Sequence, residues 1–284
     1  MKNLLFYFIL FFAATSPGCA QSVTTSAKPA ITSTGSNDTF QFHRFIPGNF
    51  IYMNVDVLDN IYVITEGNQL KKMNSMGDSL AVFNDVKKYG NPSYIDVSNP
   101  LKILVYYKNF STVVVLDRLL INRNNINFRK KNIFSVQAVA TSYDNNVWLF
   151  DEQDYKIKKI DEDGNLLQES TDMRLLVDTV PSPVQIIDHN NQVYLYDENK
   201  GFYIFDYYGA LKNNLPFLHW KNTAISRNMI YGFIENQLLS YELNTLILKK
   251  YTLPSFISSY ESLKAINGKL YLLNERGIEI YNVR

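Results

Sequence analysis

The amino-acid sequence predicts an all-β protein, a six-bladed β-propeller whose last blade is closed by an N-terminal strand. A short apolar run, clearest at residues 147–150, recurs along the chain at intervals of roughly 40 residues, the length of one four-stranded blade. The runs are rich in aromatic and β-branched residues, too short for helices, and bounded by Asn, Asp and Gly. The last repeat is one strand short of a full blade, whereas an extra strand is expected where the folded part of the chain begins.

The runs open at equivalent positions and define the repeat. These organising positions are Tyr62, Ile103, Trp148, Tyr194, Tyr231 and Tyr271. An inner strand is expected before each run, at residues 52–55, 94–97, 136–141, 184–187, 223–226 and 263–266. A third strand is expected after each run, and an outer strand follows it in the first five repeats, so that each of these repeats supplies one sheet. Six runs therefore predict six blades, over residues 39–284.

Ring closure is predicted from the two ends of this region. Residues 40–45 alternate apolar and polar side chains, as an outer strand does. The last repeat offers strands only at residues 263–266, 270–273 and 278–281. We expect residues 40–45 to complete the sixth blade, which leaves no open edge between the first blade and the last.

The first 20 residues have the pattern of an export signal. Lys2 precedes an apolar run at residues 4–14, which is too short to span a bilayer as a helix and is followed by small residues. Two processing routes remain open. Cys19 after Gly18 is similar to a lipidation site, although Ser16 stands where such sites usually carry Leu; the other route is ordinary cleavage after Ala20.

Residues 21–38 are rich in Ser and Thr and are expected to form a flexible tether. A tether favours lipidation of Cys19, since an anchored domain needs one. The protein is therefore expected to be exported, to the periplasm or the outer membrane, and to be held there by a lipid anchor. The anchor would be its contact with a membrane.

Composition narrows the class of protein. Cys19 is the only cysteine, so no disulfide is expected and burial of the core must stabilise the fold. The sequence has 28 basic and 27 acidic residues, and removal of residues 1–20 deletes only Lys2, leaving 27 of each. A neutral domain gives no general electrostatic basis for binding nucleic acid. We expect a monomeric domain without a cofactor.

Residues 144–151 (DNNVWLFD) and 156–164 (KIKKIDEDG) resemble an NHL-type propeller repeat. Residues 58–64 with 70–77 are similar, as are residues 191–197, and the aspartate that follows the second strand is present as Asp151 and Asp197. The resemblance implies a propeller fold. It does not decide function, because that family includes both enzymes and binding platforms.

A second repeating feature lies four residues after each organising position. The residues there are Glu66, Tyr107, Glu152, Glu198, Glu235 and Glu275. Because all of them follow the second strand, they are expected on one face of the disc, where an acidic rim could bind a basic partner or a cation. The alternative is that repetition merely preserves a solvated turn residue.

An enzymatic alternative rests on three aspartates near the ends of inner strands, Asp56, Asp96 and Asp188. Six-bladed propellers of the gluconolactonase and strictosidine-synthase type are similar in outline, and this resemblance implies a metal-dependent hydrolase with ligands around the central channel. The same aspartates could instead cap turns. No nucleophile motif or phosphate-binding loop accompanies them.

The interpretation that the sequence favours is a non-catalytic, protein-binding platform in the bacterial cell envelope. It is similar in outline to propeller lipoproteins that support outer-membrane assembly or secretion machinery, which implies an envelope protein as partner. The second repeat is expected to carry the distinctive surface, because Tyr106, Tyr107 and Phe110 interrupt the repeat with aromatic side chains that are expected to be exposed. The alternative is that these aromatics pack between neighbouring blades.

Overall fold

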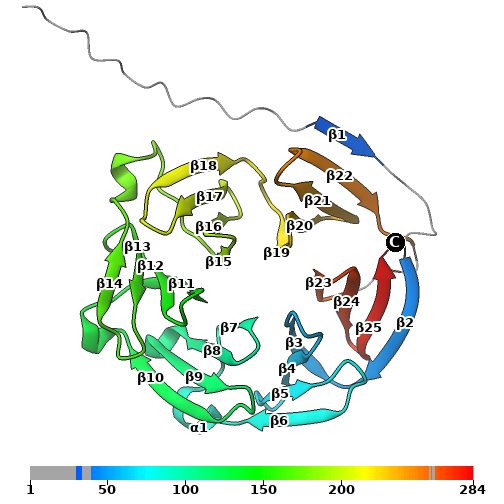
Figure 1. Ribbon diagram of the computed structural model, residues 1–284. Coiled ribbons are helices and arrows are strands. Elements are labelled where there is room, and N and C mark those ends of the chain that lie inside the picture. Colours follow the sequence, from blue (N-terminus) through cyan, green and yellow to red (C-terminus); the bar gives the residue numbers. More distant parts are fainter. Residues whose placement is uncertain (1–29, 34–39, 256, 258–259, 284) are drawn as a thin grey trace, which may run out of the picture.

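The computed structural model describes residues 30–33, 40–255, 257 and 260–283. Six antiparallel four-stranded sheets surround a central axis as the blades of a six-bladed β-propeller (Figure 1). The predicted fold class is thereby confirmed. None of the helices in the described ranges has the length and hydropathy that a membrane span requires. The expected export signal, with Cys19, lies outside the described residues.

Each blade runs from an inner strand at the axis to an outer strand. Blade 1 holds β3 (Phe50–Val55), β4 (Ile61–Thr65), β5 (Leu70–Met73) and β6 (Ser79–Phe83), and blade 2 holds β7 (Tyr94–Asn99), β8 (Lys102–Tyr107), β9 (Thr112–Asp117) and β10 (Asn122–Asn127). Blade 3 holds β11 (Val136–Thr141), β12 (Val147–Asp151), β13 (Lys156–Ile160) and β14 (Leu166–Glu169), and blade 4 holds β15 (Gln185–His189), β16 (Gln192–Asp197), β17 (Gly201–Asp206) and β18 (Leu211–Leu215). Blade 5 holds β19 (Lys221–Ser226), β20 (Met229–Ile234), β21 (Gln237–Glu242) and β22 (Ile247–Thr252), and blade 6 holds β23 (Ser262–Ile266), β24 (Lys269–Asn274), β25 (Gly277–Val283) and β2 (Phe40–Pro47).

Short helices occupy some of the connections. Helix α1 (Val86–Tyr89) lies between blades 1 and 2, and η2 (Lys108–Phe110) lies between the second and third strands of blade 2. Helix η3 (Arg129–Lys131) lies between blades 2 and 3, and η4 (Met173–Leu175) lies between blades 3 and 4.

Strands from both ends of the chain close the ring. β2 pairs antiparallel with β25, from Phe40 opposite Val283 to Pro47 opposite Gly277. In Figure 1 this outer strand, in blue, lies beside the red C-terminal strand. The predicted closure of the last blade by residues 40–45 is confirmed.

One strand was not expected. β1 (Ala30–Ser33) lies within the range predicted to be a flexible tether, and it pairs in parallel with β22, with Ala30 opposite Ile247. Blade 5 therefore carries a fifth strand at its outer edge (Figure 1). Parallel pairing between segments so far apart in the chain leaves no local signal in the sequence.

The hydrophobic core is divided among the six interfaces between neighbouring blades. The organising residues Tyr62, Trp148, Tyr194 and Tyr271 are among the largest fully buried side chains. Tyr62 of blade 1, for example, shares a buried cluster with residues of blade 2. Since each blade buries one apolar face against the next, the repeat in the sequence reflects a repeat in packing.

Gly277 at the ring closure gives a test of how tightly the two termini pack. Its φ is +143°, and a Cβ atom built there would lie 2.2 Å from the carbonyl oxygen of Ile46 in β2. Gly277→Ala is expected to lower the free energy of unfolding by roughly 1–3 kcal/mol, measured by urea denaturation, because backbone has to move.

Gly268→Ala is the matched control. Gly268 also has a positive φ, +71°, but a Cβ atom there would meet nothing closer than 3.9 Å. Gly268→Ala is expected to lower the free energy of unfolding by less than Gly277→Ala does. Equal losses for the two variants would contradict tight packing at the closure.

Candidate functional site

The turns of the blades form two faces with different chemistry. Consecutive strands are antiparallel, so the turns after the first and third strands open on one face and those after the second strand open on the other. We call the second one the Glu face, since it carries the turns with Glu66, Glu152, Glu198, Glu235 and Glu275. The first is the Asx face, because its turns begin with Asp or Asn at Asp56, Asn74, Asn99, Asp117, Asp161 and Asp206.

The six predicted rim residues on the Glu face are not equivalent. Glu66, Glu198, Glu235 and Glu275 are exposed. Glu152 is half-buried and accepts hydrogen bonds from the Ser135 hydroxyl and the Gln137 amide. An even acidic rim is therefore not formed.

Tyr107 is the clearest correction to the sequence analysis. Its side chain is buried, with its ring stacked on Tyr89 of α1 at a centroid distance of 4.9 Å. Tyr106 is buried too, and its hydroxyl donates to the carbonyl of Val136 in blade 3. The expectation of exposed aromatics in blade 2 was wrong for both residues and holds only for Phe110, because helix α1 and blade 3 cover the two tyrosines.

Two rim residues come together in a groove between blades 5 and 6. Glu235 and Glu275 line a cavity of about 890 Å³ together with Glu261, Glu279 and Arg276. Glu198 instead lines a cavity on the central axis. Of the six predicted rim residues, two therefore line this groove and one lines the mouth of the channel.

The three aspartates of the enzymatic alternative lie at the opposite end of the channel and hold the fold together. Asp56 caps its own turn, accepting the backbone N–H groups of Leu58 and Asn60, each at 2.9 Å. Asp96 accepts the N–H of Thr141, in the next blade, at 2.6 Å. Among the residues that the structure describes, no three or more His, Cys, Asp or Glu side chains are grouped so that they could hold a metal ion.

Asp188 organises an aromatic cluster between blades 3 and 4. Its carboxylate accepts hydrogen bonds from Trp148 Nε1 at 2.8 Å, from the Tyr207 hydroxyl at 2.5 Å and from the backbone N–H of Tyr143 at 3.1 Å. Tyr143 stacks on Tyr207, with centroids 4.3 Å apart and planes 4° from parallel. Burial raises the pKa of Asp188 despite these donors. The carboxylate holds both the backbone N–H of Tyr143 and the hydroxyl of Tyr207, on which Tyr143 stacks. It thereby fixes the orientation of the ring of Tyr143, which is 61% exposed.

Five turns of the Asx face share an arrangement that the sequence analysis missed. In each, the side-chain oxygen of the first residue accepts the N–H of the residue two positions later, at 2.9–3.0 Å. The residues held in this way at the turn tips are Leu58, Met76, Leu101, Leu119 and Tyr208. All five are large and apolar or aromatic, and 54–88% exposed, where a solvated turn normally carries polar residues.

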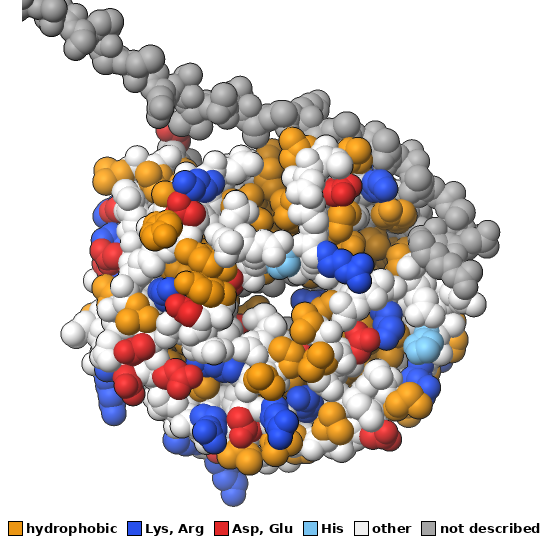
Figure 2. Space-filling model, in the orientation of Figure 1, with side chains coloured by type: hydrophobic (Ala, Val, Ile, Leu, Met, Phe, Trp, Pro, Cys, Tyr) orange, Lys and Arg blue, Asp and Glu red, His pale blue; other side chains and the backbone are white. Residues whose placement is uncertain are grey.

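Together with Tyr143, these tips form an arc over blades 1 to 4. The pattern that could have revealed them is an Asp or Asn followed two residues later by a large hydrophobic residue inside a turn. Figure 2 shows one face of the disc, hollowed at its centre, with hydrophobic side chains spread over it between polar and charged ones.

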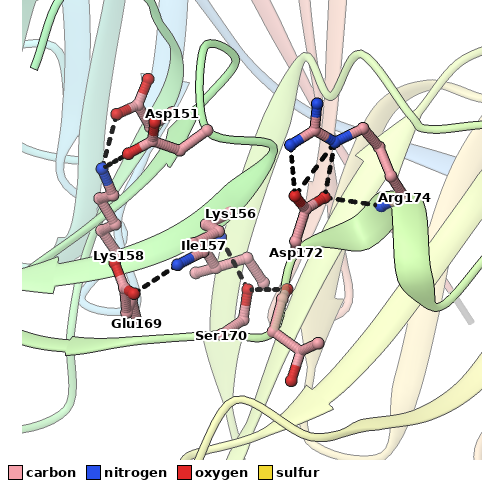
Figure 3. Close-up of polar contacts among 10 residues, drawn as sticks. Asp151, Lys156, Ile157, Lys158, Glu169, Ser170, Asp172 and Arg174 are labelled. Atoms are coloured by element: carbon pink, nitrogen blue, oxygen red, sulfur yellow. Dashed lines mark hydrogen bonds and ion pairs between the residues drawn. The ribbon is translucent and has the colours of Figure 1, made fainter.

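The aspartate of the NHL-like motif has a structural role in blade 3. Asp151 forms an ion pair with Lys158 at 2.8 Å, and both side chains are less than a tenth exposed (Figure 3). Asp154 is a second partner of the same ammonium group. Burial lowers the pKa of Lys158, but the hydrogen bonds and charges of the two aspartates outweigh it and raise that pKa above its ordinary value.

The central channel consists of two cavities of about 140 and 190 Å³. The first opens toward the Asx face, where Asp56, Asp188 and His189 line it, and the second opens toward the Glu face. Four residues line both cavities and mark the waist of the channel. They are Asn54, Tyr94, Gln185 and Lys264.

No protein-family model matches the sequence, and no curated protein is similar to it in sequence. Solved structures are similar in fold. A streptogramin B lyase is 18% identical and has a TM-score of 0.55, with 82% of this chain and 78% of that chain covered. The WD40 domain of Pan2 from Neurospora crassa is 8% identical, with a TM-score of 0.58 and coverage of 83% and 89%.

A third structure is the extracellular domain of BT3049 from B. thetaiotaomicron, 14% identical, with a TM-score of 0.52. There, 82% of this chain matches 33% of that chain. Identities this low show a shared propeller fold and nothing finer. The NHL-type resemblance stays a prediction.

Proposed function

We propose that this chain is a non-catalytic platform of the bacterial cell envelope that binds a partner protein through its Asx face. The observation that carries the proposal is the set of five capped turns that hold large apolar side chains in solvent. Exposed apolar groups that gather on one face of a soluble domain are typical of interaction surfaces.

The geometry of these turns suits binding. A turn whose N–H groups are already held by an Asp or Asn side chain loses little conformational freedom when a partner docks. Aromatic anchors such as Tyr143 and Tyr208 are the side chains most often found at the energetic centre of protein interfaces. The arc over blades 1 to 4 therefore offers rigid contacts on a fixed scaffold.

The envelope location rests on the N-terminal pattern. Export, with lipidation at Cys19, would place the domain in the periplasm or at the outer membrane. The similarity to an extracellular propeller domain is in keeping with this placement. The partner would then be an envelope protein, such as a component of outer-membrane assembly or secretion machinery.

The Glu face would supply a second contact. Glu235 and Glu275, in the groove between blades 5 and 6, suit a basic segment of the partner. A catalytic role has less support, since Asp56, Asp96 and Asp188 each accept several hydrogen bonds within the fold.

The test is a mild-detergent pull-down of the tagged full-length protein from its native envelope. A variant with Leu58→Ser, Leu101→Ser and Leu119→Ser is expected to retain less than a tenth of the partner, because losing ~1.4 kcal/mol of binding energy already weakens affinity tenfold. All three side chains are exposed, so the fold should tolerate the changes.

The matched control changes exposed residues of the Glu face that lie outside the groove between blades 5 and 6, by Glu66→Gln and Glu198→Gln. Partner loss in the leucine variant alone supports docking on the Asx face, and loss in the control alone moves the interface to the Glu face. Failure to recover any stoichiometric partner with the unmodified protein would contradict the platform itself.

A further inference from the structure

Lys264 breaks the pattern of the inner strands. It lies on β23 opposite the organising residue Tyr271. The residues opposite the organising position in four other blades are Asn54, Ala140, Ile187 and Ala224. Packing around the axis therefore does not require a lysine at this position of the repeat.

The ammonium group of Lys264 lacks an internal partner. The side chain is half-buried and lines both cavities of the channel, at its waist. Among the described residues, no hydrogen bond or ion pair involves its Nζ atom. A cation withdrawn from bulk water without a partner is costly, and burial lowers the pKa of Lys264 to about 8.

The neighbouring waist residues are already engaged. Asn54 donates to the carbonyl of Ile95 at 3.0 Å, and Gln185 and Thr223 bind each other. Tyr52 donates to the same carbonyl, and burial raises the pKa values of both Tyr52 and Tyr94, which keeps them neutral. Lys264 is thus the cation left at the waist of the described channel.

The other charged groups stand apart from it. Asp96 shares the first cavity with Lys264, and its charge acts on the ammonium without forming an ion pair. Asp56, Asp188 and His189 line the end toward the Asx face, and Glu198 lines the other end.

A carboxylate at the waist would meet Lys264 directly. Asp96 already accepts three hydrogen bonds, from the N–H and hydroxyl of Ser98 and from the N–H of Thr141. An ionised carboxylate has about four acceptor sites, so one is left for a donor group on the same molecule.

We propose that the channel binds a small carboxylate that carries a hydroxyl or amino group, with Lys264 as the counter-ion and Asp96 as the acceptor for that group. A cavity of about 150 Å³ holds a molecule the size of benzene, so the channel suits ligands of a few carbon atoms. Charge-assisted hydrogen bonds are the stronger kind, and the half-buried position of Lys264 reduces their screening by water. This site is independent of docking on either face.

The probe is sodium lactate, titrated into the full-length protein and followed by ligand-observed NMR. Lys264→Met is expected to weaken binding at least tenfold. Raising the pH from about 7.5 to about 9.5 should weaken it roughly 20-fold, because the ammonium loses its proton above its pKa of about 8.

Two controls separate binding from structure. Lys249→Met makes the same chemical change on the exposed side of β22 and should leave lactate binding unchanged. Lys264→Met should be at least as stable as the unmodified protein to urea at neutral pH, because burying the charged ammonium costs stability there. A merely structural lysine would be needed for stability and would not set lactate affinity.

Sodium propionate lacks the hydroxyl of lactate and is expected to bind more weakly. Equal binding of the two compounds would overturn the role given to Asp96. The site itself is overturned if Lys264→Met binds lactate as the unmodified protein does, or if neither carboxylate binds at tens of millimolar.

Discussion

Asp151→Ala is expected to lower the free energy of unfolding by about 3 kcal/mol or more in urea denaturation at neutral pH. The substitution leaves the ammonium of Lys158 buried without the partner that is itself almost fully buried. Removing one member of a buried ion pair typically costs ~3–5 kcal/mol, because the remaining charge is still withdrawn from water. Asp154 stays available to Lys158, which places the expectation at the lower end of that range.

Asp154→Ala is the matched control for this ion pair. Asp154 binds the same ammonium group, but its side chain is 47% exposed. Pairs that reach solvent contribute ~0–1 kcal/mol, so this variant should unfold close to the unmodified protein. Equal destabilisation by the two substitutions would contradict the assignment of Asp151 as the buried partner that blade 3 depends on.

Trp148→Ala is expected to destabilise the protein by roughly 3–5 kcal/mol. Trp148 is among the largest fully buried side chains and belongs to the cluster between blades 3 and 4. Its removal leaves a cavity and also takes one donor from the half-buried carboxylate of Asp188. Urea denaturation measures the loss of unfolding free energy. The fluorescence intensity of the remaining tryptophan, Trp220, reports whether the fold is retained.

Trp148→Phe separates the two contributions. It keeps most of the apolar volume and removes the N–H donor, so a cost of about 1–3 kcal/mol is expected. If the phenylalanine variant lost as much as the alanine variant, the hydrogen bond to Asp188 rather than packing would hold this interface together.

The architecture could be predicted because a propeller repeats one local pattern six times. Tyr62, Trp148, Tyr194 and Tyr271 mark buried second strands in the sequence, and the structure buries each of them. Ring closure could also be inferred, since a missing strand at one end and a spare strand at the other leave one arrangement. These predictions depend on strand periodicity, which neighbouring residues determine.

The candidate sites could not be predicted in the same way, because they depend on contacts between blades. Asp188 meets Trp148 from 40 residues away, and Tyr107 is covered by Tyr89 of a short helix that has no place in the repeat. The waist of the channel brings together Asn54 and Lys264 from blades 1 and 6. A motif shows which residues recur, whereas the unusual residue at one position acquires meaning only when its spatial neighbours are known.

The pairing of β1 with β22 has a mechanical consequence. β1 precedes β2 in the chain, so tension applied at the N-terminal end reaches the four-residue β1 before the eight-residue β2 that closes the ring. The tension acts first on the pairing of β1 with β22 and only then on the pairing of β2 with β25, so the shorter pairing is expected to separate first. Under such tension, β1 would detach and lengthen the chain while β2 keeps the ring closed.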